Sequence, residues 1–118
     1  MKTRILIAVL VLTTVAFAQQ GTRKHLKSQL AQEKHLPFSS GVLVGDTLYI
    51  AGASGVDAMT KNPVSAEEEA RLVMNEIKRV VEQAGMTMDD IVQLQVYCTD
   101  LSNYDIFNGV YRTYFKGD

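Results

Sequence analysis

Apolar residues change their spacing along the chain, and the first clear pattern is a pair of short strands. Residues 42–44 and 47–51 are mostly apolar and flank the dipeptide Gly45-Asp46. A two-residue connection with glycine first is typical of a type II′ hairpin turn. We therefore predict an antiparallel strand pair around this turn.

A three-and-four spacing of apolar residues predicts a long helix starting after Ser65. The predicted buried stripe consists of Ala66, Ala70, Val73, Ile77, Val80, Val81 and Ala84. Ser65 with Glu68 three residues later forms the capping-box pattern, and Gly85 occupies the position that favours a left-handed C-cap. Sequence pattern and both ends therefore predict the same helix.

Residues 92–98 alternate apolar and polar side chains, which is the period-two pattern of a strand covered on one face. The pattern predicts that Cys98 points inward as a core thiol. A second helix is expected over residues 103–115, with Phe107, Val110, Tyr111 and Tyr114 as its apolar face. Gly109 inside that helix indicates either a bend or a group that packs closely against it.

These elements give the order β-β-α-β-α, an α+β domain. A strand followed by a helix normally leads into a further strand, reached by a right-handed crossover. The sequence therefore predicts that the final strands of the sheet belong to a segment beyond Asp118.

The N-terminus has the pattern of a secretory signal peptide. Lys2 and Arg4 precede an apolar run over residues 5–15, followed by Ala16-Phe17-Ala18. The run is shorter than the roughly 18 to 20 residues that span a bilayer. We predict cleavage after Ala18 and a periplasmic or secreted protein with no stable membrane anchor; an uncleaved anchor is the alternative.

The predicted division of the chain is a signal peptide at 1–18, an N-terminal arm at 19–35 and an incomplete domain at 36–118. Within the arm, residues 26–30 fit either a short strand or a helical turn. Cleavage would leave ten basic and thirteen acidic residues, a net charge near −3. This charge argues against nucleic acid as a partner.

Few residues have the spacing that catalysis or metal binding requires. A single cysteine excludes an intramolecular disulfide and a multi-cysteine zinc site, and His25 and His35 lack helical ligand spacing, so we expect neither metal nor cofactor. The segment 52–55 fails the nucleophile-elbow pattern because Val56 stands where glycine is needed. Asp89 and Asp90 are interpreted as turn formers rather than a catalytic pair.

Several short motifs together carry a family resemblance. They are Leu-Pro-Phe-Ser-Ser-Gly-Val at 36–42, Val-Gly-Asp-Thr-Leu-Tyr-Ile-Ala-Gly at 44–52, Ala-Gly-Met at 84–86, Asp-Asp-Ile-Val at 89–92 and Val-Tyr-Cys-Thr-Asp-Leu at 96–101. In this order they resemble the RidA (YjgF) family. The resemblance implies a chorismate-mutase-like, ferredoxin-like α+β fold and a homotrimer with ligand clefts between subunits.

The resemblance also implies an activity, the hydrolytic deamination of reactive enamines and imines of the 2-aminoacrylate type to 2-keto acids and ammonia. Such a 2-iminobutanoate/2-iminopropanoate deaminase would take its catalytic arginine, from a Pro-Ala-Arg motif, and a glutamate from beyond Asp118. The substrate-binding positions that it implies here are Phe38, Gly52, Tyr104 and Asn108.

Two departures from the family pattern support a competing function. Phe38 stands where many active members have tyrosine, and Ala51 replaces a serine of the site. The alternative is a non-catalytic trimeric protein that binds a small imine or carboxylate ligand or acts like a chaperone.

Overall fold

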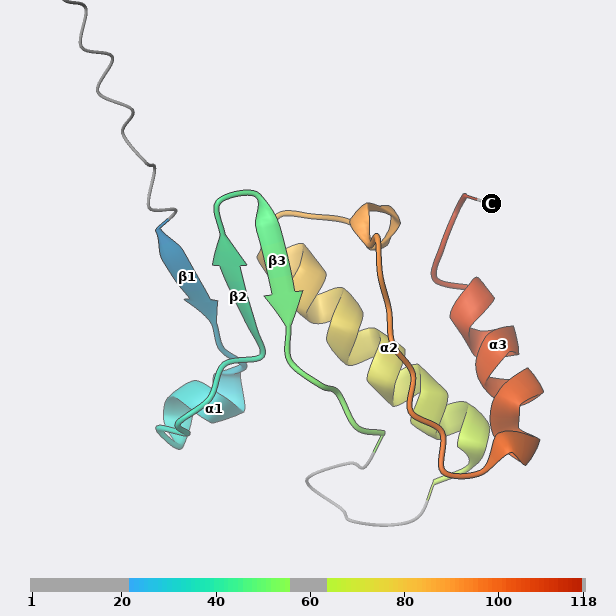
Figure 1. The fold of residues 1–118 in the computed structure, drawn as a ribbon. Helices are drawn as coiled ribbons and strands as arrows, with labels where there is room; N and C mark the ends of the chain where they lie inside the picture. The colour runs from blue at the N-terminus through green and yellow to red at the C-terminus, as the bar shows by residue number, and fades with distance from the viewer. Residues whose placement is uncertain (1–21, 56–63, 118) are drawn as a thin grey trace, which may run out of the picture.

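The structure, a computed structural model, describes residues 22–55 and 64–117. The predicted signal peptide and its cleavage site lie outside these residues. In chain order the elements are β1 (Arg23–Leu26), α1 (Gln29–Glu33), β2 (Gly41–Val44), β3 (Thr47–Ile50), α2 (Ala66–Gln83) and α3 (Tyr104–Arg112). Figure 1 shows the three strands side by side, with α2 and α3 next to each other beyond them. The α+β class is confirmed.

The predicted hairpin is confirmed as the β2–β3 pair. Val44 lies opposite Thr47, so Gly45 and Asp46 alone form the turn. Gly45 has φ +62°, the positive value that the first residue of a type II′ turn requires. The backbone N–H of Ala51 also donates to the carbonyl of Ser40 at 2.9 Å, which extends the ladder by one pair.

The segment treated as an N-terminal arm contains two elements of the domain. β1 pairs antiparallel with β2, and Leu26 at its end is buried. Ser28 then caps α1 by accepting the backbone N–H of Ala31 at 3.2 Å, and Ala31 is buried as well. The open choice at residues 26–30 is thus resolved as a strand end followed by a helix start.

Helix α2 has the predicted ends. Ser65 accepts the backbone N–H of Glu68 at 3.2 Å. At the other end Gly85 has φ +81°, and the N–H groups of Gly85 and Met86 donate to the carbonyls of Glu82 and Val81. This hydrogen-bond pattern is a Schellman motif, in which glycine avoids the strain of a left-handed residue.

The core forms where α2 faces β3 and α3. Its fully buried centre is Met74, with Val81 and Met88 beside it. The predicted stripe of α2 omitted Met74, although Met74 is one helical turn from Ala70. Partly buried side chains pack around this centre: Leu48, Ile50, Ile77, Met86, Ile91, Leu94, Phe107, Tyr111, Tyr114 and Phe115.

Helix α3 ends at Arg112, earlier than predicted, and a 3-10 turn at Leu101–Asn103 precedes it. Its predicted apolar face does pack on the core. Tyr114 also reaches α2, where its hydroxyl donates to Asn75 Oδ1 at 2.7 Å. Of the two alternatives at Gly109, a close contact is excluded, because a Cβ built there meets no atom within 4 Å.

The strand predicted over residues 92–98 is not formed. The stretch is extended but has no strand partner in the described structure. Ile91 and Leu94 contact the core, whereas Val92 is fully exposed. Cys98 is exposed too, and its thiol donates to the carbonyl of Asp100 at 2.9 Å, so the prediction of a buried thiol is wrong. Without a paired strand on either side, nothing holds the alternate side chains in register.

The two acidic residues before this stretch have separate structural roles. Asp90 accepts the backbone N–H of Thr87 at 2.7 Å, and this hydrogen bond lowers the pKa of its carboxyl group. Asp89 accepts the backbone N–H of Lys116 at 3.0 Å. Each carboxylate therefore accepts from the backbone of a different segment.

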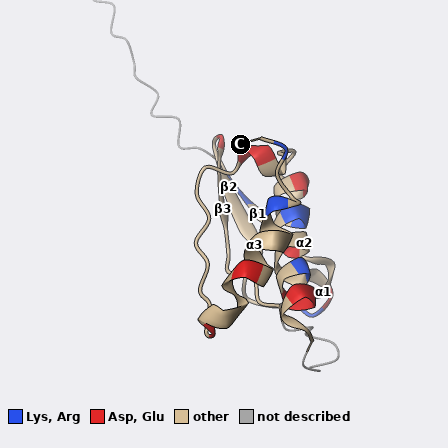
Figure 2. Cartoon of the chain, turned by 90° about the vertical axis from the view of Figure 1, so that its right-hand side faces the viewer, with Lys and Arg blue, Asp and Glu red and all other residues tan. Residues whose placement is uncertain are grey.

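In Figure 2 most of the acidic and basic positions lie on the helices. Within residues 22–55 and 64–117, no helix is long and apolar enough to cross a bilayer.

Candidate functional site

A cavity of about 510 Å³ lies between the two extended parts of the chain. One wall is residues 50–55, at the end of β3 and just after it. The other wall is Ile91 with residues 93–99, and the floor is α2. The floor residues Ala66, Ala70, Val73 and Ile77 repeat at helical spacing, so one face of α2 lines the whole cavity.

The lining is nearly uncharged. Glu69 is the only acidic or basic side chain in the cavity wall, and the polar groups beside it are hydroxyls, amides and one thiol. Among the described residues no lysine or arginine reaches the cavity. An anionic ligand would therefore have backbone N–H groups, hydroxyls and amides as its partners within this part of the chain.

The loop that forms one wall lies directly on α2 at Gly55. A Cβ built on Gly55 would come within 1.9 Å of Glu69 Cγ, 2.7 Å of Glu69 O and 2.9 Å of Glu69 Cα. Only glycine allows this approach, because two of the three atoms belong to the helix backbone. At Gly52, in the same loop, a Cβ would meet nothing within 4 Å. Gly55 thus positions the loop, and Gly52 faces open space.

The structure brings two of the four predicted substrate-binding residues together. Gly52 lies in one wall of the cavity, and Tyr104, at the first position of α3, lies at its edge. Ala51 also lines the cavity. Asn108 is half-buried on α3, one helical turn from Tyr104, and is not part of the lining.

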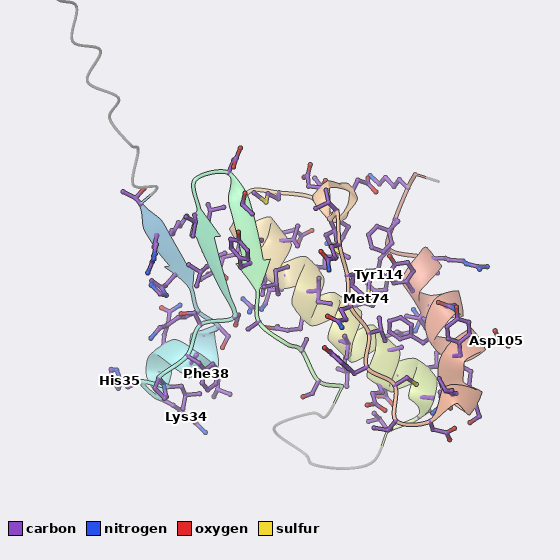
Figure 3. All side chains as sticks on the ribbon, viewed as in Figure 1. Lys34, His35, Phe38, Met74, Asp105 and Tyr114 are labelled. Carbon is purple, nitrogen blue, oxygen red and sulfur yellow. The ribbon has the colours of Figure 1, made fainter. Side chains whose placement is uncertain are left out.

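Phe38 lies away from the cavity. It is 58% exposed, and Figure 3 shows it close to α1, near Lys34 and His35, whereas Asp105 marks α3 at the opposite end of the molecule. A hydrogen bond links the loop that contains Phe38 to β1, because His25 Nδ1 lies 3.2 Å from Ser39 Oγ.

Next to Phe38, Ser40 links the same loop to α2. Arg79 donates to Ser40 Oγ at 3.1 Å and to both carboxylate oxygens of Glu76. The hydrogen bond from Arg79 lowers the pKa of Glu76. Because Ser40 also bonds to Ala51, this network joins the Phe38 loop to the wall that contains Gly52.

Sequence reasoning did not identify most of the lining residues as binding positions, and Glu69, Cys98 and Asn103 are examples. Cys98 was expected in the core because the alternation of residues 92–98 placed it on the covered face of a predicted strand. Asn103 could have been found from its position just before a helix, where polar side chains gather. Glu69 has no sequence signal, since its place at the cavity depends on the contact with Gly55.

No group of three metal-ligating side chains exists in the described part of the chain. The basic residues near the N-terminus, Arg23, Lys24 and His25, are exposed on β1.

Comparison with known proteins gives a consistent family. The family model described as Endoribonuclease L-PSP matches residues 28–118. A RutC family protein of Saccharolobus solfataricus is 43% identical over 82 residues, which cover 68% of this chain and 65% of that relative. A RutC family protein of Sulfurisphaera tokodaii is 34% identical over 82 residues, which cover 68% of this chain and 66% of the relative. The match therefore spans just under two thirds of these relatives' length.

Solved structures agree in fold. A Rid family protein of Yersinia pestis is 28% identical with a TM-score of 0.68, over 81% of this chain and 78% of that one. The structure of Escherichia coli TdcF with bound serine is 31% identical with a TM-score of 0.61, over 67% of this chain and 63% of that one. A Mycobacterium tuberculosis member of the YjgF/YER057c/UK114 family, at 24% identity and a TM-score of 0.66, covers 80% of this chain and 75% of its own. The last of these comparisons supports the fold alone.

Proposed function

The chain belongs to the RidA (YjgF) family, the family of the Endoribonuclease L-PSP model, and from this premise we propose that it contributes to the hydrolytic deamination of small imines. The proposed substrates are 2-imino acids, formed from enamines of the 2-aminoacrylate type. Water adds to the C=N carbon, the C–N bond then breaks, and the products are a 2-keto acid and ammonia.

The observation that carries the proposal is the meeting of Gly52 and Tyr104 at one cavity, although they are 52 positions apart in the sequence. An imine is already electrophilic, so the protein needs to position the substrate and supply a proton rather than activate a strong nucleophile. The open space at Gly52 lets a ligand approach the backbone closely. The Tyr104 hydroxyl is a neutral donor for the substrate nitrogen or carboxylate.

The carboxylate clamp is proposed to be an arginine outside these 118 residues, as the family resemblance implies. A guanidinium can hold a carboxylate through two parallel hydrogen bonds. The E. coli relative with bound serine is an example of a family member that holds an α-amino acid, whose carboxylate is the group such a clamp would bind.

We propose that the assembly is a homotrimer with each site completed by a neighbouring subunit. Two features support it: Phe38 lies far from the cavity of its own subunit, and several large apolar side chains are exposed. Among these are Tyr49 at 64%, Val92 at 101% and Tyr97 at 85%. Side chains of this kind usually become buried when proteins associate.

The second candidate function is binding without catalysis, favoured by Phe38 and Ala51 in place of the tyrosine and serine of many active relatives. Phenylalanine at position 38 has no hydroxyl to place a water molecule. A ligand could then be held in the same cleft without being hydrolysed.

The test uses the complete protein from its source. A pyridoxal-phosphate-dependent dehydratase generates 2-iminopropanoate from serine. Ammonia release is followed without semicarbazide, because trapping also releases ammonia, and the rate of semicarbazone formation is followed in a parallel reaction that contains it. Deamination predicts faster release of ammonia and less semicarbazone. Tyr104→Phe should reduce this acceleration, whereas Tyr111→Phe should leave it unchanged because Tyr111 packs on the core and does not line the cavity.

The outcomes separate the two functions. Saturable binding of serine or pyruvate by calorimetry without faster ammonia release supports the binding protein. If the protein shows no binding and no acceleration, both candidate functions are overturned. An equal effect of the two tyrosine variants would remove Tyr104 from the proposed site.

A further inference from the structure

Residues 34–40 join α1 to β2 and contain neither helix nor strand. This segment carries Phe38, whose side chain is 58% exposed. Its first half is fixed by α1, because the backbone N–H of Leu36 donates to the carbonyl of Ala31 at 2.9 Å. An irregular segment keeps one conformation only where other parts of the fold offset the loss of its conformational entropy. The position of Phe38 therefore depends on contacts that its neighbours make.

The contact between this segment and α2 is made by Arg79, whose Nη2 donates to Ser40 Oγ at 3.1 Å. Ser40 lies close to the helix because β2 begins directly on it. A Cβ built on Gly41 would come within 2.8 Å of Val80 Cγ1, and Val80 is buried. Arg79 precedes Val80 just as Ser40 precedes Gly41, so the two polar side chains meet beside the packed pair.

The guanidinium of Arg79 is oriented by two other residues of α2. Its Nε donates to Glu76 Oε2 at 2.8 Å, its Nη2 to Glu76 Oε1 at 2.6 Å, and its Nη1 to Gln83 Oε1 at 3.1 Å. The pair with Glu76 is bidentate, which fixes direction as well as distance. The hydrogen bond from Arg79 is the first cause of the lowered pKa of Glu76, and Ser40 acts in the same direction. Glu76 and Gln83 thus direct Arg79 toward Ser40.

Another ion pair of the same helix shows why Arg79 is unusual. Arg71 bonds to Glu67 at 2.8 Å, and both side chains are at least half exposed. Such a pair contributes little to stability, because water screens the two charges. The guanidinium of Arg79 also bonds to a residue 39 positions away in the sequence. It therefore joins α2 to a distant segment of the chain.

Ser40 in turn connects two of the predicted substrate-binding residues. It lies two positions after Phe38, and its carbonyl accepts the backbone N–H of Ala51 at 2.9 Å. Ala51 is followed by Gly52, which lines the cavity. In the proposed trimer Phe38 is presented to a neighbouring subunit, so its position depends on how its segment is attached to its own domain. Ser40 is the point of attachment.

We propose that Arg79, oriented by Glu76, is a positioning residue of the ligand site, and that it acts through Ser40 on both Phe38 and Gly52. This inference rests on the proposed function, which makes those two residues parts of the site. Arg79 itself does not line the cavity. Its loss should let the segment move, and a displacement of about 1 Å in a site can reduce activity by roughly 10²-fold.

The first test is amide hydrogen exchange on the complete protein. The Ala51 amide is the reporter, because it donates to Ser40. We expect Arg79→Met, which keeps a long side chain but removes every donor, to speed exchange at Ala51 by about tenfold while the amides within α2 keep their rates. Arg71→Met is the matched control, since it removes an arginine from the same helix, and it should leave Ala51 unchanged. A general loss of stability would instead speed the α2 amides as well.

The second test asks whether Arg79 acts through the Ser40 hydroxyl. Ser40→Ala removes the hydroxyl and keeps the carbonyl that accepts from Ala51. Its effect on the Ala51 amide should match that of Arg79→Met. The double variant should show no further increase, because the two changes remove the same hydrogen bond. Additive effects would mean that the two residues act separately, and would overturn the proposal.

The third test measures function in the same variants. In the ammonia-release assay, Arg79→Met and Ser40→Ala should each reduce the acceleration by about tenfold, an intermediate loss for a displaced site, and Arg71→Met should not. If the protein binds ligand without catalysis, the dissociation constant for serine or pyruvate should rise by about the same factor.

The results separate this inference from the proposed function. An Ala51 amide that exchanges in Arg79→Met as it does in the wild type or in Arg71→Met would overturn the positioning role. Faster exchange with unchanged activity and unchanged ligand affinity would overturn it too. A wild-type protein that neither binds ligand nor accelerates ammonia release would overturn the proposed function and the role of Arg79 in a ligand site, whereas the exchange rates would still show whether Arg79 fixes the segment.

Discussion

The contact between Gly55 and α2 allows a sharp test with a built-in control. Replacing Gly55 by alanine adds a Cβ that would lie 1.9 Å from Glu69 Cγ, 2.7 Å from Glu69 O and 2.9 Å from Glu69 Cα. The Glu69 side chain can move, but its Cα and carbonyl are part of the helix. The loop that forms the cavity wall must therefore shift away from α2.

Overpacking of this kind costs about 1 to 3 kcal/mol of folding free energy. For a domain of this size that corresponds to a fall in melting temperature of roughly 4 to 12 °C. Gly52→Ala is the matched control, because its Cβ meets nothing within 4 Å and no positive φ stands in its way. Alanine there should be neutral or stabilise by up to about 1 kcal/mol through the unfolded state.

Urea and thermal unfolding of the two variants, followed by circular dichroism, would measure the difference. The variant Gly55→Ala/Glu69→Ala completes the experiment, since it removes Glu69 Cγ and leaves both backbone contacts. We expect it to recover only part of the lost stability. Wild-type stability for Gly55→Ala, or full recovery in the double variant, would refute a backbone-to-backbone contact at this point.

Three further predictions concern pH, thiol reactivity and processing. The pKa of Glu76 is lowered from its ordinary value of 4.5, first by the hydrogen bond from Arg79. The stability that Glu76 contributes should therefore be present above pH 4.5 and lost as pH falls through the lower pKa of the folded state. In an acid titration, Glu76→Gln should lose less stability than the wild type, and identical curves would contradict this. Cys98 is exposed, so a thiol reagent should modify it in the native protein at a rate close to that in urea, whereas a rate at least tenfold slower would indicate a covered thiol. N-terminal sequencing of protein recovered from the periplasm or medium of its source should begin at Gln19, and a chain that retains residues 1–18 would contradict cleavage after Ala18.

Local chemistry along the chain was sufficient to predict the elements whose ends and turns are determined by neighbouring residues. The hairpin at Gly45 and the helix between Ser65 and Gly85 are of this kind, because a turn or a cap involves groups only a few positions apart. The family motifs indicated the fold class by resemblance, and those at 44–52 and 84–86 lie in the hairpin and at the end of the helix.

Residues 92–98 show the limit of such reasoning. Their alternation is that of a strand, but a strand exists only when another backbone pairs with it, and no neighbour is present in the described structure. Whether the Cys98 side chain faces the core or the solvent could therefore not be deduced from its own segment. Met74 was missed in a related way, because only the packing of β3 and α3 on α2 shows which part of an amphipathic helix becomes the centre.

For the candidate site too, the sequence identified individual residues and the tertiary structure decided which of them lie together. Sequence motifs alone identified Gly52, Tyr104, Phe38 and Asn108 as binding positions, but not which of them share a cavity. Only the tertiary structure placed Gly52 and Tyr104 at one cavity and Phe38 far from it, because those distances depend on how the sheet packs on α2. The close approach of Gly55 to Glu69 is likewise a property of two packed segments, and a pattern within either segment contains no information about it.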